Sequence, residues 1–326
     1  RRNPAKMSAR IMLTNYHGIL LPVTTPFAED EEFDRRGLTE NIKKWNTTGI
    51  TGYVILGSTG ERVNLDEREY VEVIETARQA VPKELAFIAG AGQQSTRGTI
   101  GEIEVAARAG AEAVLVITPH YYRSAISQDA LVSHYTAVAD ASSIPIILYS
   151  MPDLTGINIE PETAARLSVH ENIVGIKDSS ADVAKLAETV RLVPDDFAVM
   201  IGNGTVFCEA LQAGARAGIL AVGCAAPQLC VAIYDAVQAG EIDRASALQA
   251  ALTPLARAVT KTYGIGGLKA ALEMAGLIGG AVRAPLQLPG EEGRDEIAEL
   301  LREAMDASGK APLAKVSEPG AVATGS

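Results

Sequence analysis

The chain has 326 residues, of which 47% are hydrophobic and 21% are charged, and its formal net charge is −11. A hydrophobic share of this size supplies a sizeable core and excludes a chain that is disordered throughout. The acidic balance, without a basic stripe, argues against nucleic acid and acidic membrane surfaces as partners, and no apolar run approaches the ~18 residues of a membrane span.

Residues 1–15 lack a long apolar region, so they are predicted to form a flexible arm and not a secretory signal. A transit-peptide remnant is the alternative for this basic stretch, which leaves a mitochondrial location open beside the favoured cytoplasm. Three cysteines are too few for a disulfide framework and lack metal-ligand spacing with the four histidines. They indicate a reducing compartment, and no metal site is expected.

From residue 16 to 226, short apolar runs alternate with segments of helical periodicity. The runs are nearly continuous in hydrophobicity, which is typical of strands buried on both faces. Eight β-then-α units predict a closed (β/α)8 TIM barrel, in preference to a doubly wound open sheet. The predicted strands are residues 19–24, 53–56, 86–89, 113–118, 145–149, 173–177, 197–201 and 218–222.

The predicted helices of the barrel include residues 66–80, 99–109 and 128–141, and a helix that starts at Pro161. After the last strand only helical periodicity follows, so residues 227–307 are predicted to be a helical extension. It either packs on the barrel or forms an oligomer interface. Its predicted helices are residues 228–239, 242–261, 265–275 and 291–305. The remaining residues, 308–326, are rich in Pro, Gly, Ala and Ser and are predicted to be a flexible tail.

Catalytic groups of such barrels lie at the carboxyl ends of the strands, so the strand ends are the places to search. The second predicted strand is followed by Gly57-Ser58-Thr59-Gly60-Glu61. Two glycines around two hydroxyl residues form a tight turn that exposes backbone N–H groups to a small anion. An ordinary strand-to-helix turn is the alternative interpretation.

Lys177 is the only one of ten lysines that closes an apolar strand. Desolvation lowers the pKa of a lysine and leaves a neutral amine that can attack a carbonyl. The alternative is a lysine paired with Asp178. Tyr149 closes the fifth strand, where a phenol could move protons, although a tyrosine of the core is the alternative there. His120, in the loop after the fourth strand, is interpreted as a loop histidine.

The turn at 57–61, Tyr121-Tyr122, Tyr149 and Lys177 together resemble the signature of the class I pyruvate-dependent aldolases. This is the superfamily of dihydrodipicolinate synthase and N-acetylneuraminate lyase. The interval from Tyr149 to Lys177 is 177 − 149 = 28 residues, as in that signature. The resemblance covers residues 16–287, which are the predicted barrel and most of the helical extension.

The resemblance implies that Lys177 forms a Schiff base with pyruvate or another 2-oxo acid, so no further cofactor is expected. Tyr149 would shuttle the proton of the substrate hydroxyl with Ser58 in its relay. The N–H groups of Ser58 and Thr59, next to Gly57, would bind the carboxylate of the 2-oxo acid.

The resemblance also implies that Tyr121 enters the site of a neighbouring subunit. The active chain is therefore expected to be a homo-oligomer, with a dimer usually contained in a tetramer. Ser179 and Gly202, after the sixth and seventh strands, are assigned to the substrate-binding set.

Leu154 stands where dihydrodipicolinate synthases carry an arginine, and an aliphatic side chain cannot hold a carboxylate. The segments 118–123, 147–150, 177–179, 263–265 and 283–287 resemble instead the 4-hydroxy-2-oxoglutarate aldolase of the animal type, although Thr59 replaces its asparagine. The predicted activity is therefore cleavage of 4-hydroxy-2-oxoglutarate, or a related acid, to pyruvate and glyoxylate. Alternatives are a dihydrodipicolinate synthase, a 2-keto-3-deoxy sugar acid aldolase or dehydratase, and a non-catalytic barrel that binds an oxo acid.

Overall fold

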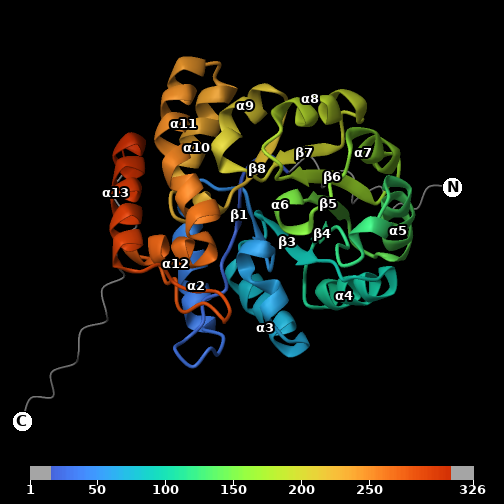
Figure 1. Ribbon diagram of the computed structural model, residues 1–326, viewed down its shortest axis with the longest axis horizontal. Helices are drawn as coiled ribbons and strands as arrows, with labels where there is room; N and C mark the ends of the chain where they lie inside the picture. Colours follow the sequence, from blue (N-terminus) through green and yellow to red (C-terminus); the bar gives the residue numbers. More distant parts are fainter. Residues whose placement is uncertain (1–15, 310–326) are drawn as a thin grey trace, which may run out of the picture.

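The computed structural model describes residues 16–309 and contains a closed barrel of eight parallel strands (Figure 1). Each strand pairs with the next, and β8 returns to β1 through the register of Ala217 with Gly18. The predicted (β/α)8 barrel is confirmed. The strands are β1 (Gly18–Pro22), β2 (Gly52–Ile55), β3 (Ala86–Ala91), β4 (Ala113–Ile117), β5 (Ile146–Ser150), β6 (Ile173–Asp178), β7 (Ala198–Ile201) and β8 (Ala217–Ile219).

The core has two layers, because side chains alternate between the two faces of a strand. One set fills the barrel interior, and Leu20, Val54 and Leu115 belong to it. The other set, with Leu21, Ile55 and Val116, lies between the strands and the surrounding helices. Both faces of the strands are thus buried in apolar surroundings, which explains their continuous hydrophobicity in the sequence.

Helices follow the strands around the barrel, and four more form the extension. Those of the barrel are α2 (Arg35–Trp45), α3 (Glu67–Ala80), α4 (Thr96–Arg108), α5 (Gln128–Ala141), α6 (Pro152–Thr155), α7 (Pro161–Ser168), α8 (Val183–Leu192) and α9 (Phe207–Gln212). Those of the extension are α10 (Pro227–Gln238), α11 (Ile242–Arg257), α12 (Gly264–Met274) and α13 (Glu291–Ser308). The Asp66 side chain caps α3 by accepting the Glu69 N–H at 2.8 Å, which fixes the predicted start of that helix.

Predicted boundaries differ from the structure by a few residues at several elements, and three of these differences have a clear local reason. The α4 helix begins at Thr96, because the Ser95 side chain accepts the Gly98 N–H and acts as the cap. The β8 strand ends at Ile219, since a 3-10 turn starts at Ala221. The predicted helix 242–261 ends as an α-helix at Arg257 and continues as a single π turn, Ala258–Thr262, closed by the Tyr263 N–H and the Ala258 carbonyl.

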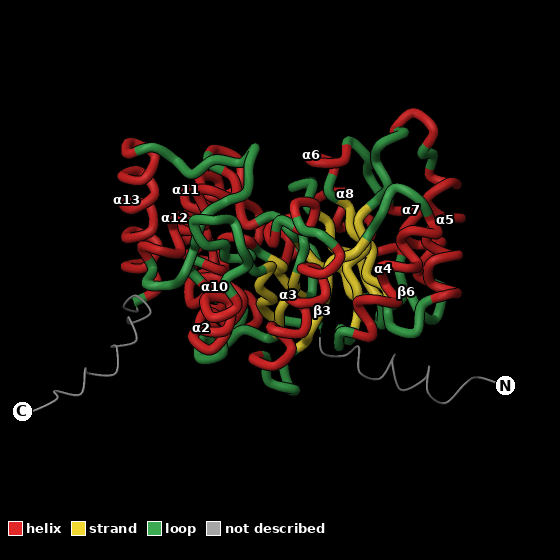
Figure 2. Tube along the Cα trace, turned by 90° about the horizontal axis from the view of Figure 1, so that it is seen from below, coloured by secondary structure: helices red, strands yellow, loops and turns green. Residues whose placement is uncertain are grey.

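The extension packs on the barrel, as one of the two predicted alternatives states. Helices α10–α13 gather at one side of the strands, and α13 is outermost (Figures 1 and 2). The Asn41 side chain on α2 donates to the Ile278 carbonyl at 2.7 Å and accepts the Ile278 N–H at 2.8 Å. Lys44 on the same helix donates to the Gly276 carbonyl. These bonds join the segment after α12 to the barrel.

The predicted arm, residues 1–15, lies outside the described part of the chain, as does the predicted tail beyond residue 309. The predicted tail begins at residue 308, whereas α13 extends to Ser308. Among residues 16–309, no helix combines the length and the hydrophobicity that a membrane crossing needs.

Candidate active site

Lys177, Tyr149 and Ser58 lie together at the carboxyl ends of β6, β5 and β2. Lys177 and Tyr149 are partners in the register of β5 with β6, and both side chains are buried. The Lys177 Nζ lies 4.4 Å from the centre of the Tyr149 ring, and the Tyr149 hydroxyl lies 3.4 Å from the Ser58 Oγ. A buried amine, a buried phenol and a half-buried alcohol are therefore arranged in sequence at the strand ends.

The alternative interpretation of Lys177 as the ion-pair partner of Asp178 is wrong. Asp178 pairs with Lys185 of α8, whose Nζ lies 3.0 Å from Asp178 Oδ2. The other carboxylate oxygen of Asp178 accepts the Ser180 N–H at 2.7 Å. Within residues 16–309, no carboxylate lies at ion-pair distance from the Lys177 amine. The side chain of Lys177 is thus buried beside an aromatic ring, and the described part of the chain offers it no counter-ion.

Gly202 and Ser179 border the Lys177 side chain from β7 and from the end of β6. A Cβ added at Gly202 would lie 1.9 Å from the Ser179 Oγ and 2.6 Å from the Lys177 Cε, so only glycine leaves room for both. The Ser179 Oγ is buried and has no hydrogen-bond partner among the described residues. An unsatisfied buried hydroxyl beside the amine is suited to bind a polar substrate group.

The described part of the chain contains further buried hydroxyls of this kind, which the sequence analysis did not single out. The Oγ1 atoms of Thr24 and Thr118 are buried without a partner there, and these residues follow β1 and β4. Their place just after a strand is the signal that could have identified them. Cys224 lies on the same side of the barrel, where burial raises the pKa of its thiol and the charge of Lys177 opposes that rise.

The predicted anion-binding turn is a strained segment between β2 and α3. Ser58–Gly60 form a 3-10 turn, and the residues at its two sides, Leu56 and Glu61, have positive φ angles of 59° and 54°. Left-handed backbone is unfavourable for residues other than glycine and persists only where the surroundings enforce it. Gly90 of β3 permits the first of these angles, since a Cβ there would lie 2.1 Å from the Leu56 carbonyl oxygen.

Tyr121 and Leu154 are exposed, unlike the buried Lys177 and Tyr149. Tyr121 is 75% exposed and stacks edge-to-face on the equally accessible Tyr122 at 5.0 Å between ring centres. The Gln94 side chain holds this loop by accepting the N–H groups of His120 and Tyr121. Leu154, on α6, is 61% exposed.

Between residues 16 and 309, no group of three or more His, Cys, Asp and Glu side chains lies close enough to hold a metal ion. The residues gathered at the strand ends are an amine, a phenol, hydroxyls and a turn of backbone N–H groups. These groups suit covalent and acid–base chemistry on a small anion.

The sequence of this chain is similar to a known family and to named proteins. Residues 15–304 match the model of the dihydrodipicolinate synthetase family. The chain is 34% identical over 295 residues to the 4-hydroxy-tetrahydrodipicolinate synthase of Methanothrix thermoacetophila, which covers 90% of this chain and 99% of that protein. The corresponding enzyme of Methanopyrus kandleri is 35% identical over 298 residues and covers 90% and 97%.

Two similar solved structures carry pyruvate. The dihydrodipicolinate synthase of Acinetobacter baumannii, complexed with pyruvate, is 30% identical with a TM-score of 0.83 and covers 90% of this chain and 99% of that one. YagE of E. coli K12, a member of the same family in complex with pyruvate, is 28% identical with a TM-score of 0.83, and covers 89% and 98%. The chain described here therefore belongs to the dihydrodipicolinate synthetase family and is a carbon–carbon lyase.

Proposed function

We propose that this lyase cleaves 4-hydroxy-2-oxoglutarate, or a related 2-oxo acid, to pyruvate and an aldehyde through a Schiff base on Lys177. The observation that carries the proposal is the buried Lys177 amine, which lies 4.4 Å from the Tyr149 ring and has no carboxylate at ion-pair distance within residues 16–309. An amine that is in no ion pair within residues 16–309 is available as the nucleophile that the reaction requires.

Each residue of the site has its own role in the proposed reaction. The Lys177 amine adds to the keto carbon, water leaves, and a protonated imine forms. The bond between C3 and C4 of the substrate then breaks, its electron pair moves to the imine to give an enamine, and the hydroxyl on C4 loses its proton to become the aldehyde. Tyr149, with Ser58 at 3.4 Å, takes that proton. Protonation of the enamine and hydrolysis return pyruvate and the free amine.

The turn Ser58–Gly60 is assigned to the carboxylate of the 2-oxo acid. Ser58 and Thr59 are the first two residues of this turn. Their N–H groups therefore have no carbonyl within the turn to which they could donate. Backbone N–H groups of this kind bind small anions. Ser179 and Gly202 border the same space, and the unpartnered Ser179 hydroxyl is assigned to the distal part of the substrate. The pyruvate complexes of similar proteins support a pyruvyl ligand.

A second copy of the chain is part of the proposed enzyme. Tyr121 is too exposed to serve as a proton relay in its own subunit, and an exposed pair of tyrosines is typical of a protein interface. We assign Tyr121 to the site of the neighbouring subunit in a homodimer or a tetramer of two dimers. The three buried free thiols fit a reducing compartment, and the cytoplasm is the proposed location.

A 4-hydroxy-tetrahydrodipicolinate synthase is the second candidate, because curated relatives carry that name. Against it stands Leu154, an exposed aliphatic residue at the place of the arginine that holds the carboxylate of the aldehyde substrate. The two candidates share the pyruvyl Schiff base and differ in the partner aldehyde. Leu154 thus argues against the synthase, whereas the names of the relatives favour it. Because glyoxylate also carries a carboxylate, Leu154 does not by itself select 4-hydroxy-2-oxoglutarate.

Trapping with borohydride tests the shared chemistry. Incubation with pyruvate and borohydride should leave a reduced pyruvyl adduct on Lys177, which peptide mass spectrometry locates. The K177M variant should give no adduct. The exposed Lys261 is the control lysine, and its peptide should carry no adduct in the unaltered protein. A folded protein that forms no adduct would contradict the proposal.

A substrate panel then identifies the aldehyde. Pyruvate release from 4-hydroxy-2-oxoglutarate supports the first candidate, and consumption of pyruvate with a semialdehyde supports the second. Release only from 2-keto-3-deoxy sugar acids would replace both.

A further inference from the structure

The Glu61 carboxylate lies in a buried ion pair that the proposed chemistry does not use. Its Oε1 is 2.6 Å from the Nζ of Lys269, and both side chains are sealed from solvent. Lys269 belongs to α12 in the helical extension, and its Nζ also donates to the Ala281 carbonyl at 2.5 Å. The last residue of the 57–61 turn is thus tied to a segment 269 − 61 = 208 residues away in sequence.

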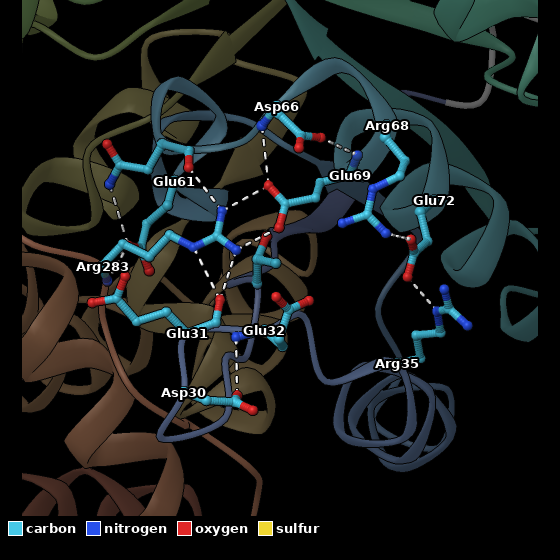
Figure 3. A network of polar contacts seen from close by, with 12 residues as sticks. Asp30, Glu31, Glu32, Arg35, Glu61, Asp66, Arg68, Glu69, Glu72 and Arg283 are labelled. Carbon is cyan, nitrogen blue, oxygen red and sulfur yellow. Dashed lines mark hydrogen bonds and ion pairs between the residues drawn. The ribbon is translucent and has the colours of Figure 1, made fainter.

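Arg283 adds a second connection between the extension and the turn, which Figure 3 shows. Its backbone N–H donates to Glu61 Oε2 at 3.3 Å, and its guanidinium donates to the Asn64 carbonyl at 2.8 Å. The same guanidinium pairs with Glu69 of α3 and lies 4.2 Å from the centre of the Phe27 ring. Both carboxylate oxygens of Glu61 are therefore held by residues of the extension.

The backbone of Glu61 needs such support. Its φ of 54° and ψ of 30° are left-handed, a conformation that side-chain-bearing residues keep only when several contacts enforce it. The neighbouring Gly60 carbonyl is held separately, by the Thr25 hydroxyl at 2.7 Å. If the carboxylate of Glu61 were released, the residue could return to ordinary backbone angles, and the N–H groups of Ser58 and Thr59 would turn with it.

The charge on Lys269 makes the pair selective for a carboxylate. Burial lowers the pKa of Lys269, and the adjacent Glu61 opposes that effect. An amide at position 61 could still accept a hydrogen bond but would leave a buried cation without its counter-ion, which proteins avoid. The Ala281 carbonyl and the Phe27 ring, at 4.5 Å, also contact the Lys269 Nζ, but neither carries the charge of a carboxylate.

We propose that Glu61 is a positioning residue that, through Lys269 and Arg283, fixes the turn whose N–H groups bind the carboxylate of the 2-oxo acid. The inference rests on the proposed function, because it assigns the carboxylate to this turn. Glu61 contacts neither Lys177 nor Tyr149, so it acts on affinity for the carboxylate and not on the nucleophile.

The test compares borohydride trapping on Lys177 by pyruvate with trapping by methyl pyruvate, in which the carboxylate is an uncharged ester. In E61Q the rate for pyruvate should fall at least tenfold relative to the rate for methyl pyruvate, and K269M should show the same change. The KM for the 2-oxo acid should rise more than kcat falls. R78M breaks the pair between Arg78 of α3 and Glu112, which directly precedes β4, away from the turn, and should leave the ratio of the two rates unchanged.

General damage to the fold lowers both rates together, so an unchanged ratio in folded E61Q and K269M would overturn the inference. If the single variants do not fold, E61Q/K269M removes both charges at once and should still show the tenfold change in ratio. A double variant that fails to fold as well would show a purely structural role and overturn the inference too. Absence of any pyruvate adduct in the unaltered protein would instead contradict the proposed function.

Discussion

Gly202 determines how much space the amine of Lys177 has. Because a Cβ at this position would overlap the Ser179 hydroxyl and press on the Lys177 Cε, alanine should push both groups from their places. A displacement of about 1 Å in an active site commonly costs ~100-fold in rate. We expect G202A to lower the rate of pyruvate trapping on Lys177 by about that factor.

The matched control for this variant is Gly101→Ala, since a Cβ at Gly101 on α4 meets nothing within 4 Å. Thermal unfolding of both variants shows whether the fold is retained. A G202A protein that traps pyruvate as fast as the unaltered chain would show that the close contact is relieved without cost to the amine.

At the scale of elements, the approach of β3 to the end of β2 is what shapes the turn. Gly90 lies where the Leu56 carbonyl points at β3, and a Cβ there would lie 2.1 Å from that oxygen. Because the obstacle is backbone, G90A should lower the free energy of unfolding by about 1–3 kcal/mol, the usual cost of overpacking. It should also slow pyruvate trapping, since the turn that starts at Gly57 moves with Leu56.

Urea unfolding measures the first effect and borohydride trapping the second. Gly101→Ala again provides the comparison, because an alanine in an open helical position stabilises by ~0.5–1 kcal/mol. Equal stabilities of G90A and G101A would contradict the steric reason given for Gly90.

At the scale of the whole molecule, the buried His134 should lower the free energy of unfolding as the pH falls. Burial on α5 lowers the pKa of His134 to about 4, and its Nδ1 lies 2.9 Å from the Thr96 hydroxyl. The unfolded chain takes up a proton near pH 6.5, whereas the folded chain does so only near pH 4. Stability is therefore complete above pH 6.5 and falls as the pH drops toward 4, by about 2 kcal/mol between pH 7.5 and 5.

Urea unfolding at these two pH values checks this expectation. H134Q keeps a hydrogen-bonding side chain but does not titrate, so its stability should change by about 2 kcal/mol less between pH 7.5 and 5. Carboxylates such as Glu69, whose pKa the Arg283 bond lowers, contribute equally in both proteins. If the unaltered protein and H134Q lost the same free energy of unfolding between pH 7.5 and 5, His134 would not be the cause.

Much of the fold was predictable because strand and helix patterns are local. The meeting of Lys177, Tyr149 and Ser58 also followed from the sequence, since parallel strands in a barrel place their carboxyl ends on one face. The tie between Glu61 and Lys269 did not, because it joins segments 208 residues apart whose side chains carry no pattern that pairs them. Likewise, the choice of Lys185 as the partner of Asp178 depends on three-dimensional packing.

The ion pair between α12 and the turn has a consequence for where the functional unit ends. A chain cut after Ala226 would keep all eight strands with Lys177, Tyr149 and Ser58, yet it would lose the cation that neutralises Glu61. If this barrel were transplanted or recombined as an independent module, the buried Glu61 carboxylate would therefore lose its Lys269 counter-ion. The smallest unit that can be exchanged between family members extends through Arg283.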